Sequence, residues 1–172
     1  MYPNYTKYVI LLIVVFLAIS AVYVVKSPTT HRIYQCAFTD RSIEIENTFH
    51  KWVTALNSGK SEDVVKLYAK DATLLPTLSP KILTTHQQLK QYFDMLAGKP
   101  HIKVVVDKLK VSVMGNIAFS NGLYTISYTE NGHTVSVPAR FSFAYQHRSG
   151  QWLIIDHHSS VLPAAQNDGK DD

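Results

Sequence analysis

The sequence predicts an α+β domain in which three N-terminal helices pack against one face of a strongly curved, mainly antiparallel sheet. Two observations predict this class. Residues 42–97 space their apolar side chains as helices do, whereas residues 101–161 form β-rich segments separated by glycine turns. Because strands joined by tight turns pair antiparallel, the helices that precede them pack on one face of the resulting sheet.

The first helix is predicted to begin at Ser42 and to end before residues 57–59. One helical face carries its apolar side chains, which is typical of a helix that packs on a core. These side chains are Ile43, Phe49, Trp52, Val53 and Leu56. The turn sequence Asn57-Ser58-Gly59 has the C-cap chemistry that ends a helix.

Two shorter helices follow. Ser61 is expected to cap the second helix, with Glu62 and Asp63 in the first turn, where the helix dipole favours acids. Its apolar side is formed by Val64, Val65, Leu67 and Tyr68. A short strand is predicted over 72–75 before two prolines interrupt the chain.

The third helix is predicted from a capping box. Thr85 is its N-cap and Gln88 stands three residues later, where its side chain can bond back to the cap. The buried stripe is expected to be Leu89, Tyr92, Phe93 and Leu96. The helix ends in the sequence Ala97-Gly98-Lys99-Pro100.

The rest of the domain is predicted as a four-strand antiparallel meander. Strands are expected over 101–114, 117–129 and 133–147, followed by a final strand that begins at Trp152. Gly115-Asn116, Glu130-Asn131-Gly132 and Ser149-Gly150 are the turns between them. The final strand begins as a buried run and ends in a cluster of ionisable and hydroxyl side chains.

The N-terminus predicts membrane targeting. Residues 8–25 contain no charge and would span about 27 Å as a helix, which is close to the hydrocarbon thickness of a membrane. An uncleaved signal anchor fits this length, whereas Ala18-Ile19-Ser20 would serve as a cleavage site for a signal peptide. The domain is therefore expected outside the cytoplasm, periplasmic or extracellular, or secreted if the signal is cleaved.

The domain boundaries follow from composition. Residues 1–26 are predicted as the signal segment, 27–41 as a linker, 42–163 as the folded domain and 164–172 as a disordered acidic tail. The formal net charge is +4, and the basic residues are scattered, which argues against a nucleic-acid partner. The single cysteine, Cys36, excludes an internal disulfide and a Cys-based zinc site. No metal and no cofactor are expected.

The polar end of the final strand holds the candidate chemistry. Asp156, His157 and His158 are the residue types that perform general acid–base catalysis near neutral pH, and they are the catalytic candidates. Two adjacent histidines on a strand point to opposite faces, so at most one of them faces a given pocket. The alternative is a structural role, in which these groups form hydrogen bonds across the sheet or at a subunit interface.

The strand register decides which side chains converge, and the sequence leaves two registers open. A three-residue loop at 148–150 would place Arg140 with Asp156 and His158, and Phe141 and Phe143 with His157 and Ser159. A two-residue turn would exchange the two sets. Tyr124 and Tyr128 share one face of an earlier strand and would line a pocket or an interface.

Two segments of the chain resemble a known superfamily. Residues 52–59, Trp-Val-Thr-Ala-Leu-Asn-Ser-Gly, and the stretch 67–76 are similar to the start of the nuclear transport factor 2-like superfamily. The late segment 150–160, with Pro163 after it, resembles the same superfamily's Gly-Lys-Trp-x-Ile-Val ending in His and Ser. Within it, the chain looks most like the association domain of calcium/calmodulin-dependent protein kinase II and its stand-alone bacterial relatives, which are SnoaL-like.

This resemblance implies a cone-shaped fold with a deep pocket between sheet and helices, and self-assembly through the outer face of the sheet, as a homodimer or larger ring. It implies no kinase activity, because kinase motifs do not occur here. The kinase association domain has pocket arginines where Phe143 and Ser159 stand in this chain.

The function expected from sequence and resemblance together is an exported or anchored homo-oligomerising domain that binds a small polar or anionic molecule. The candidate ligand-binding residues are Arg140, Tyr124, His158 and Ser159. The alternative is an isomerase, dehydratase or cyclase that uses Asp156 or a neighbouring histidine as its proton shuttle.

Overall fold

The computed structural model describes residues 13–16 and 28–164, and the chain divides into two compact units, 1–41 and 42–172. The predicted membrane segment 8–25 lies outside the described residues except for 13–16, which are helical. No helix among the described residues combines the length and apolar character needed to cross a membrane. The predicted disordered tail also lies outside them, apart from residue 164.

Three helices contribute residues to the second unit: α2 (Pro28–Asn57), which belongs to it from residue 42 onward, α3 (Ser61–Val65) and α4 (His86–Ala97). Helix α4 begins with the predicted capping box, in which the Thr85 side chain accepts from the Gln88 backbone N–H. The Gln88 side chain in turn accepts from the Thr85 backbone N–H, over 3.2 Å. This prediction is confirmed, because both partners lie within one helical turn and need no tertiary contact.

The structure corrects three details of the helical prediction. Helix α2 begins at Pro28, within the predicted linker 27–41, because proline suits the first turn of a helix and no glycine follows before Gly59. Ser61 is the first residue of α3 rather than its cap, and its hydroxyl donates to Asp94 Oδ1 over 2.5 Å. Tyr68 leaves the helix altogether and begins the first strand.

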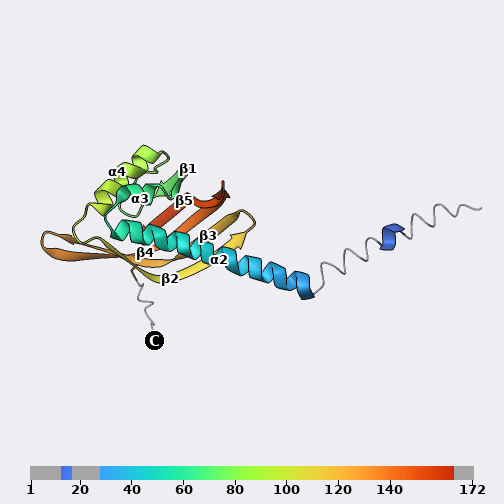
Figure 1. Ribbon diagram of the computed structural model, residues 1–172. Coiled ribbons are helices and arrows are strands. Elements are labelled where there is room, and N and C mark those ends of the chain that lie inside the picture. Colours follow the sequence, from blue (N-terminus) through green and yellow to red (C-terminus); the bar gives the residue numbers. More distant parts are fainter. Residues whose placement is uncertain (1–12, 17–27, 165–172) are drawn as a thin grey trace, which may run out of the picture. The chain divides into compact units, whose positions relative to one another are not determined.

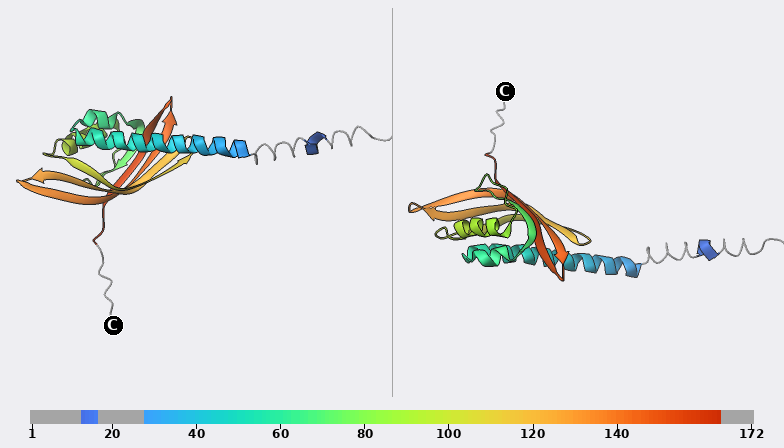
Figure 2. Two further views of the ribbon diagram at one scale, coloured as in Figure 1. Left: turned by 60° about the horizontal axis from the view of Figure 1, so that its bottom comes forward. Right: turned by 90° about the horizontal axis from the view of Figure 1, so that it is seen from above.

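The sheet has five strands: β1 (Tyr68–Leu75), β2 (Lys103–Met114), β3 (Ile117–Glu130), β4 (His133–Arg148) and β5 (Gln151–Val161). Strands β2 to β5 form the predicted antiparallel meander. Strand β1 pairs in parallel with β5, so that the order is β1-β5-β4-β3-β2 and the sheet is mixed. Figures 1 and 2 show a curved sheet with α2, α3 and α4 on one of its faces.

Both predicted registers at the β4–β5 turn prove partly correct. The turn has two residues, Ser149 and Gly150, with φ values of 49° and 85°, as tight hairpins require. Ile155 is then an extra residue on β5, because Tyr145 pairs with Ile154 and Ala144 with Asp156. This bulge restores the arrangement of the three-residue alternative, in which Phe143 lies opposite His157.

A second irregularity brings the backbone of β2 against Gly122. The pairing of β2 with β3 shifts between Val106 and Lys108. A Cβ atom at position 122 would lie 1.8 Å from the Lys108 carbonyl oxygen. Only glycine allows this close approach.

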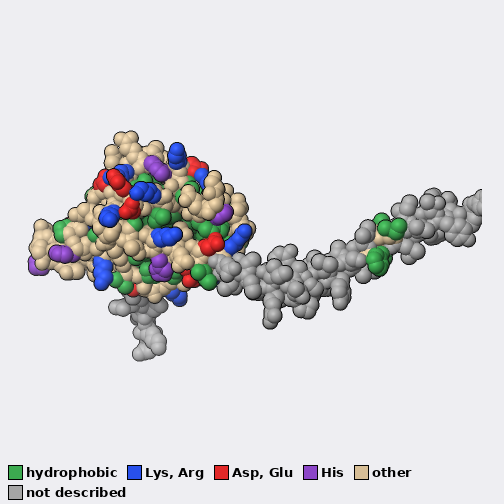
Figure 3. All heavy atoms as spheres, viewed as in Figure 1, with side chains coloured by type: hydrophobic (Ala, Val, Ile, Leu, Met, Phe, Trp, Pro, Cys, Tyr) green, Lys and Arg blue, Asp and Glu red, His purple; other side chains and the backbone are tan. Residues whose placement is uncertain are grey.

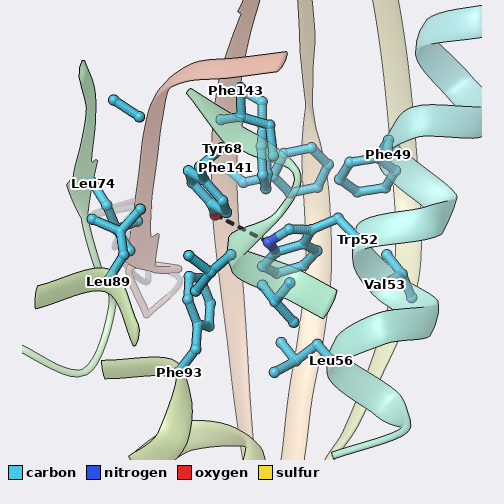
Figure 4. Packing of buried hydrophobic residues seen from close by; sticks show 14 of the residues in the cluster. Phe49, Trp52, Val53, Leu56, Tyr68, Leu74, Leu89, Phe93, Phe141 and Phe143 are labelled. Carbon is cyan, nitrogen blue, oxygen red and sulfur yellow. Dashed lines mark hydrogen bonds between the residues drawn. The ribbon is translucent and has the colours of Figure 1, made fainter. Parts of the chain in front are cut away.

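The core lies between the helices and the inner face of the sheet, the face that they cover. Phe49 and Trp52 of α2 pack there against Phe141 and Phe143 of β4, and Leu56 belongs to the same core, as Figure 4 shows. Of the five apolar residues predicted to face the core from the first helix, four are buried, and Ile43 is exposed. On the molecular face drawn in Figure 3, basic and acidic side chains alternate without a basic stripe.

Candidate functional site

Strand β5 divides the predicted site residues between the two faces of the sheet. His157 and Ser159 point to the inner face, where both are buried, and Tyr124 joins them from β3. Asp156 and His158 occupy the alternate positions and therefore lie on the outer face, together with Arg140. The four predicted ligand-binding residues do not converge: Tyr124 and Ser159 lie inside, whereas Arg140 and His158 lie outside.

A buried chain of hydrogen bonds fixes His157 on the inner face. The indole Nε1 of Trp52 donates to Tyr68 Oη over 3.0 Å, and Tyr68 Oη lies 2.7 Å from His157 Nδ1. Because an indole N–H can only donate, the single hydroxyl proton of Tyr68 is free to point to Nδ1. If the Tyr68 hydroxyl donates, a neutral His157 carries its proton on Nε2; if Nδ1 is protonated, it donates to the Tyr68 oxygen instead. In both tautomers Nε2 is buried without a hydrogen-bond partner among the described residues.

The space beside His157 is very small. It is lined by Trp52, Leu74, Pro76, Thr77, Tyr92, Phe93, Leu96, Tyr124, Ile126, His157 and Ser159, and its volume is about 10 Å³. That is room for the centre of one water molecule. The deep pocket implied by the resemblance is therefore filled in this chain by its own aromatic side chains.

Three hydroxyl groups that line this cavity are paired with one another. Tyr124 Oη donates to Ser159 Oγ over 2.7 Å, and Thr77 bonds to the same serine. Phe143 stacks on the His157 ring at 3.7 Å between centroids, at the position where the resemblance implies an arginine. The lining contains no Lys, Arg, Asp or Glu, so it offers no charge to an anionic ligand.

The outer face has a wider hollow. It has a volume of about 370 Å³ and is lined by Asn121, Gly122, Arg140, Phe141, Ser142, His158 and Ser160. Arg140 Nε donates to Ser160 Oγ over 3.0 Å, which holds the guanidinium beside β5. The groups around the hollow are mostly donors and hydroxyls, which suits a carboxylate as occupant.

Burial sets the electrostatics of the two faces. It lowers the pKa of His157 to about 3, so this imidazole stays neutral at physiological pH. Burial also raises the pKa of Asp156, and nearby His158 partly opposes that shift. On the inner face, burial raises the pKa of Tyr124 to about 12 and that of Tyr68 well above its usual range.

No metal site emerges from the part of the chain that the structure describes. There, no three His, Cys, Asp or Glu side chains lie close enough together to share an ion. His157 and His158 point to opposite faces of β5, as the sequence predicted for two adjacent residues on a strand.

Sequence reasoning missed two partners of the inner polar chain. The apolar pattern predicts a helical position for Tyr68, and no pattern marks Thr77, which follows a proline in a loop. Local composition offers little signal for Tyr68, since only Tyr68 and Thr73 in the segment from Tyr68 to Leu75 have high strand propensity.

Comparison with known proteins identifies the family of this fold. The family model described as calcium/calmodulin dependent protein kinase II association domain matches residues 41–163. A search of the curated proteins found no match.

Solved structures agree with this match. A candidate calcium/calmodulin dependent protein kinase II association domain from Xanthomonas campestris is 38% identical, with 71% of this chain and 88% of that chain covered and a TM-score of 0.66. The CamKII hub homology domain from Chlamydamonas reinhardtii shares the fold at 20% identity, covering 72% and 99%, with a TM-score of 0.61. A candidate dehydratase of the NTF2-like family from Streptomyces avermitilis shares it at 15% identity, covering 73% and 99%, with a TM-score of 0.65. The chain has the nuclear transport factor 2-like fold, and it belongs to the calcium/calmodulin dependent protein kinase II association domain family.

Proposed function

We propose that this protein is a self-associating module whose copies meet through the outer face of the sheet. The observation that carries this proposal is a group of apolar side chains on that face, Met114, Ile117, Phe119 and Leu123, which we call the outer apolar band. They alternate with buried inner residues along β2 and β3, and none is fully buried. Met114 is 62% exposed.

The outer apolar band fits a contact between proteins better than it fits solvent. Adjacent apolar side chains on one sheet face gain free energy when a second surface removes them from water. The described helices pack on the opposite face of the sheet and leave this one uncovered. The names of the matched family and of the Chlamydamonas hub homology domain support association as the shared role.

Ligand binding and catalysis receive less support than association. The inner cavity has room for one water molecule, and the proton-shuttle candidates Asp156 and His158 lie on the other face of the sheet. The relative named as a candidate dehydratase shares the fold at 15% identity. Acid–base catalysis would require several polar groups to converge on one substrate-sized cavity.

We expect the purified full-length protein, kept in a mild detergent because of its apolar segment, to be a dimer or larger by light scattering at tens of micromolar. Phe119→Lys should shift it toward monomer, because a buried unpaired charge opposes the contact. Lys51→Glu on exposed α2 is the matched control and should leave the mass unchanged. A strictly monomeric wild-type protein would contradict the proposal.

We further propose that residues 8–25 anchor the domain to a membrane or direct its export. The support is the uncharged apolar run itself. Fractionation of expressing cells should place the protein with membranes or outside the cytoplasm. Recovery of the full-length chain from the soluble cytosol would refute this proposal.

A further inference from the structure

The outer face carries a carboxylate that no group of the described chain satisfies. Asp156 is half-buried, yet its oxygens accept no hydrogen bond and form no ion pair among the described residues. Burial raises the pKa of Asp156 because it disfavours the charged form, and nearby His158 opposes this shift only in part. A partly buried carboxylate normally has a donor or a cation beside it.

The same face carries a guanidinium with unused donors. Arg140 bonds to Ser160 through Nε alone, and in the described part of the protein no carboxylate lies within ion-pair distance of it. The two terminal nitrogens of an arginine form a fork that matches a carboxylate. Arg140 also lines the outer hollow, whose volume of about 370 Å³ has room for an inserted side chain.

The strand register explains why Arg140 and Asp156 do not pair within one chain. Arg140 lies opposite Ser160, whereas Asp156 lies four residues earlier on β5, opposite Ala144. Four residues of antiparallel strand span about 14 Å, which is beyond the reach of an arginine side chain. The cross-strand pair Ser142 and His158 lies midway between the two charges.

This spacing makes the face complementary to itself. In a twofold-symmetric dimer every contact occurs twice: if one residue of the first copy contacts a second residue of the other copy, the same two residues also meet with the copies exchanged. Consider a twofold axis that lies in the plane of the contact, runs perpendicular to β4 and β5, and passes through the pair Ser142 and His158. Rotation about this axis exchanges the Arg140 end of the outer face with the Asp156 end. It places the Arg140 end of one copy over the Asp156 end of the other.

We infer that Arg140 of each copy binds Asp156 of the partner subunit, so that two identical ion pairs fix the register of a face-to-face dimer. The inference rests on the proposed self-association. It adds the contact geometry, because the outer apolar band alone would not select one orientation. Opposite charges at the Arg140 and Asp156 ends favour this register and oppose a contact in which like charges meet.

A charge exchange tests the pair in the full-length protein. Arg140→Glu and Asp156→Arg should each weaken dimerisation at least 10-fold, measured as the dissociation constant by sedimentation in mild detergent. The double variant should return to within about 3-fold of wild type, because it restores the pair with the charges reversed. Lys51→Glu, an identical change of charge on the helical side, should have no effect.

Milder variants guard against a folding defect. Arg140→Gln and Asp156→Asn remove the charges without reversing them and keep polar side chains, and the double-mutant cycle should show a coupling of at least 5-fold in the dissociation constant. A dimer whose constant is unchanged by these variants, or changed additively, would overturn the ion pair while leaving self-association intact. Weaker dimerisation with Arg140→Gln but not with Asp156→Asn would mean that Arg140 binds a group other than Asp156, and would also overturn it. A monomeric wild-type protein would instead remove the proposed function.

Discussion

Replacing Trp52 by alanine should lower the free energy of unfolding by about 3–5 kcal/mol. Its side chain is 1% exposed and contacts five rings: Phe49, Phe93, Tyr124, Phe143 and His157. Removal leaves a large cavity where helix, sheet and the inner polar chain meet. It also removes the donor to Tyr68, whose hydroxyl lies 3.0 Å away.

Trp52→Phe separates the two causes. Phenylalanine keeps much of the packing but cannot donate to Tyr68, so we expect a loss of about 1–2 kcal/mol. Both variants can be measured by urea unfolding followed by far-UV circular dichroism, which does not depend on the tryptophan being replaced. The exposed neighbour Lys51→Ala should change stability by less than about 0.5 kcal/mol. A loss below about 1 kcal/mol for Trp52→Ala would contradict the central position of this side chain.

The helix boundaries that depend on local chemistry could be predicted from sequence. Thr85 and Gln88 form their capping box within one turn, and Gly59 ends α2 with a φ of 73°. Such signals act over three or four residues and need no tertiary contact to form. The prediction of Ser61 as a cap was wrong because its hydroxyl bonds to Asp94, 33 residues away.

The placement of the site residues required tertiary information. The bulge at Ile155 inverts which side chains of β5 face inward, and sequence patterns do not show which strand absorbs an extra residue. Strand β1 was also too short in the prediction, because Tyr68 pairs with Ile154 across a parallel contact distant in sequence. These two features together place His157 inside and Asp156 outside.

The filling of the inner cavity also could not be predicted. Phe143 and Ser159 were expected to lie by a pocket on the basis of the resemblance, and both line the inner side. How much space remains depends on how Trp52, Tyr124 and Phe141 stack, with 4.8 Å between the ring centroids of the last two. Side-chain packing of this kind is decided by all neighbours at once.

The buried imidazole of His157 should make the domain lose stability as the pH falls. Its pKa is lowered from 6.5 to about 3 in the folded protein, so between these values the unfolded chain binds a proton that the folded chain does not. The stabilisation is complete above pH 6.5 and is lost progressively toward pH 3. At about 1.4 kcal/mol per pH unit, the loss from pH 6.5 to 4.5 is about 2–3 kcal/mol.

His157→Gln isolates this contribution, because glutamine offers Tyr68 an acceptor and does not titrate. We expect the free energy of unfolding of this variant, measured in urea between pH 8 and pH 4.5, to fall less steeply than that of wild type. Other groups, including Asp156, titrate in both proteins and cancel in the difference, provided that protein concentration is held constant. His133→Gln, at an exposed hairpin end, should follow wild type. Parallel curves for His157→Gln and wild type would mean that His157 is not the buried neutral group on which the inner polar chain depends.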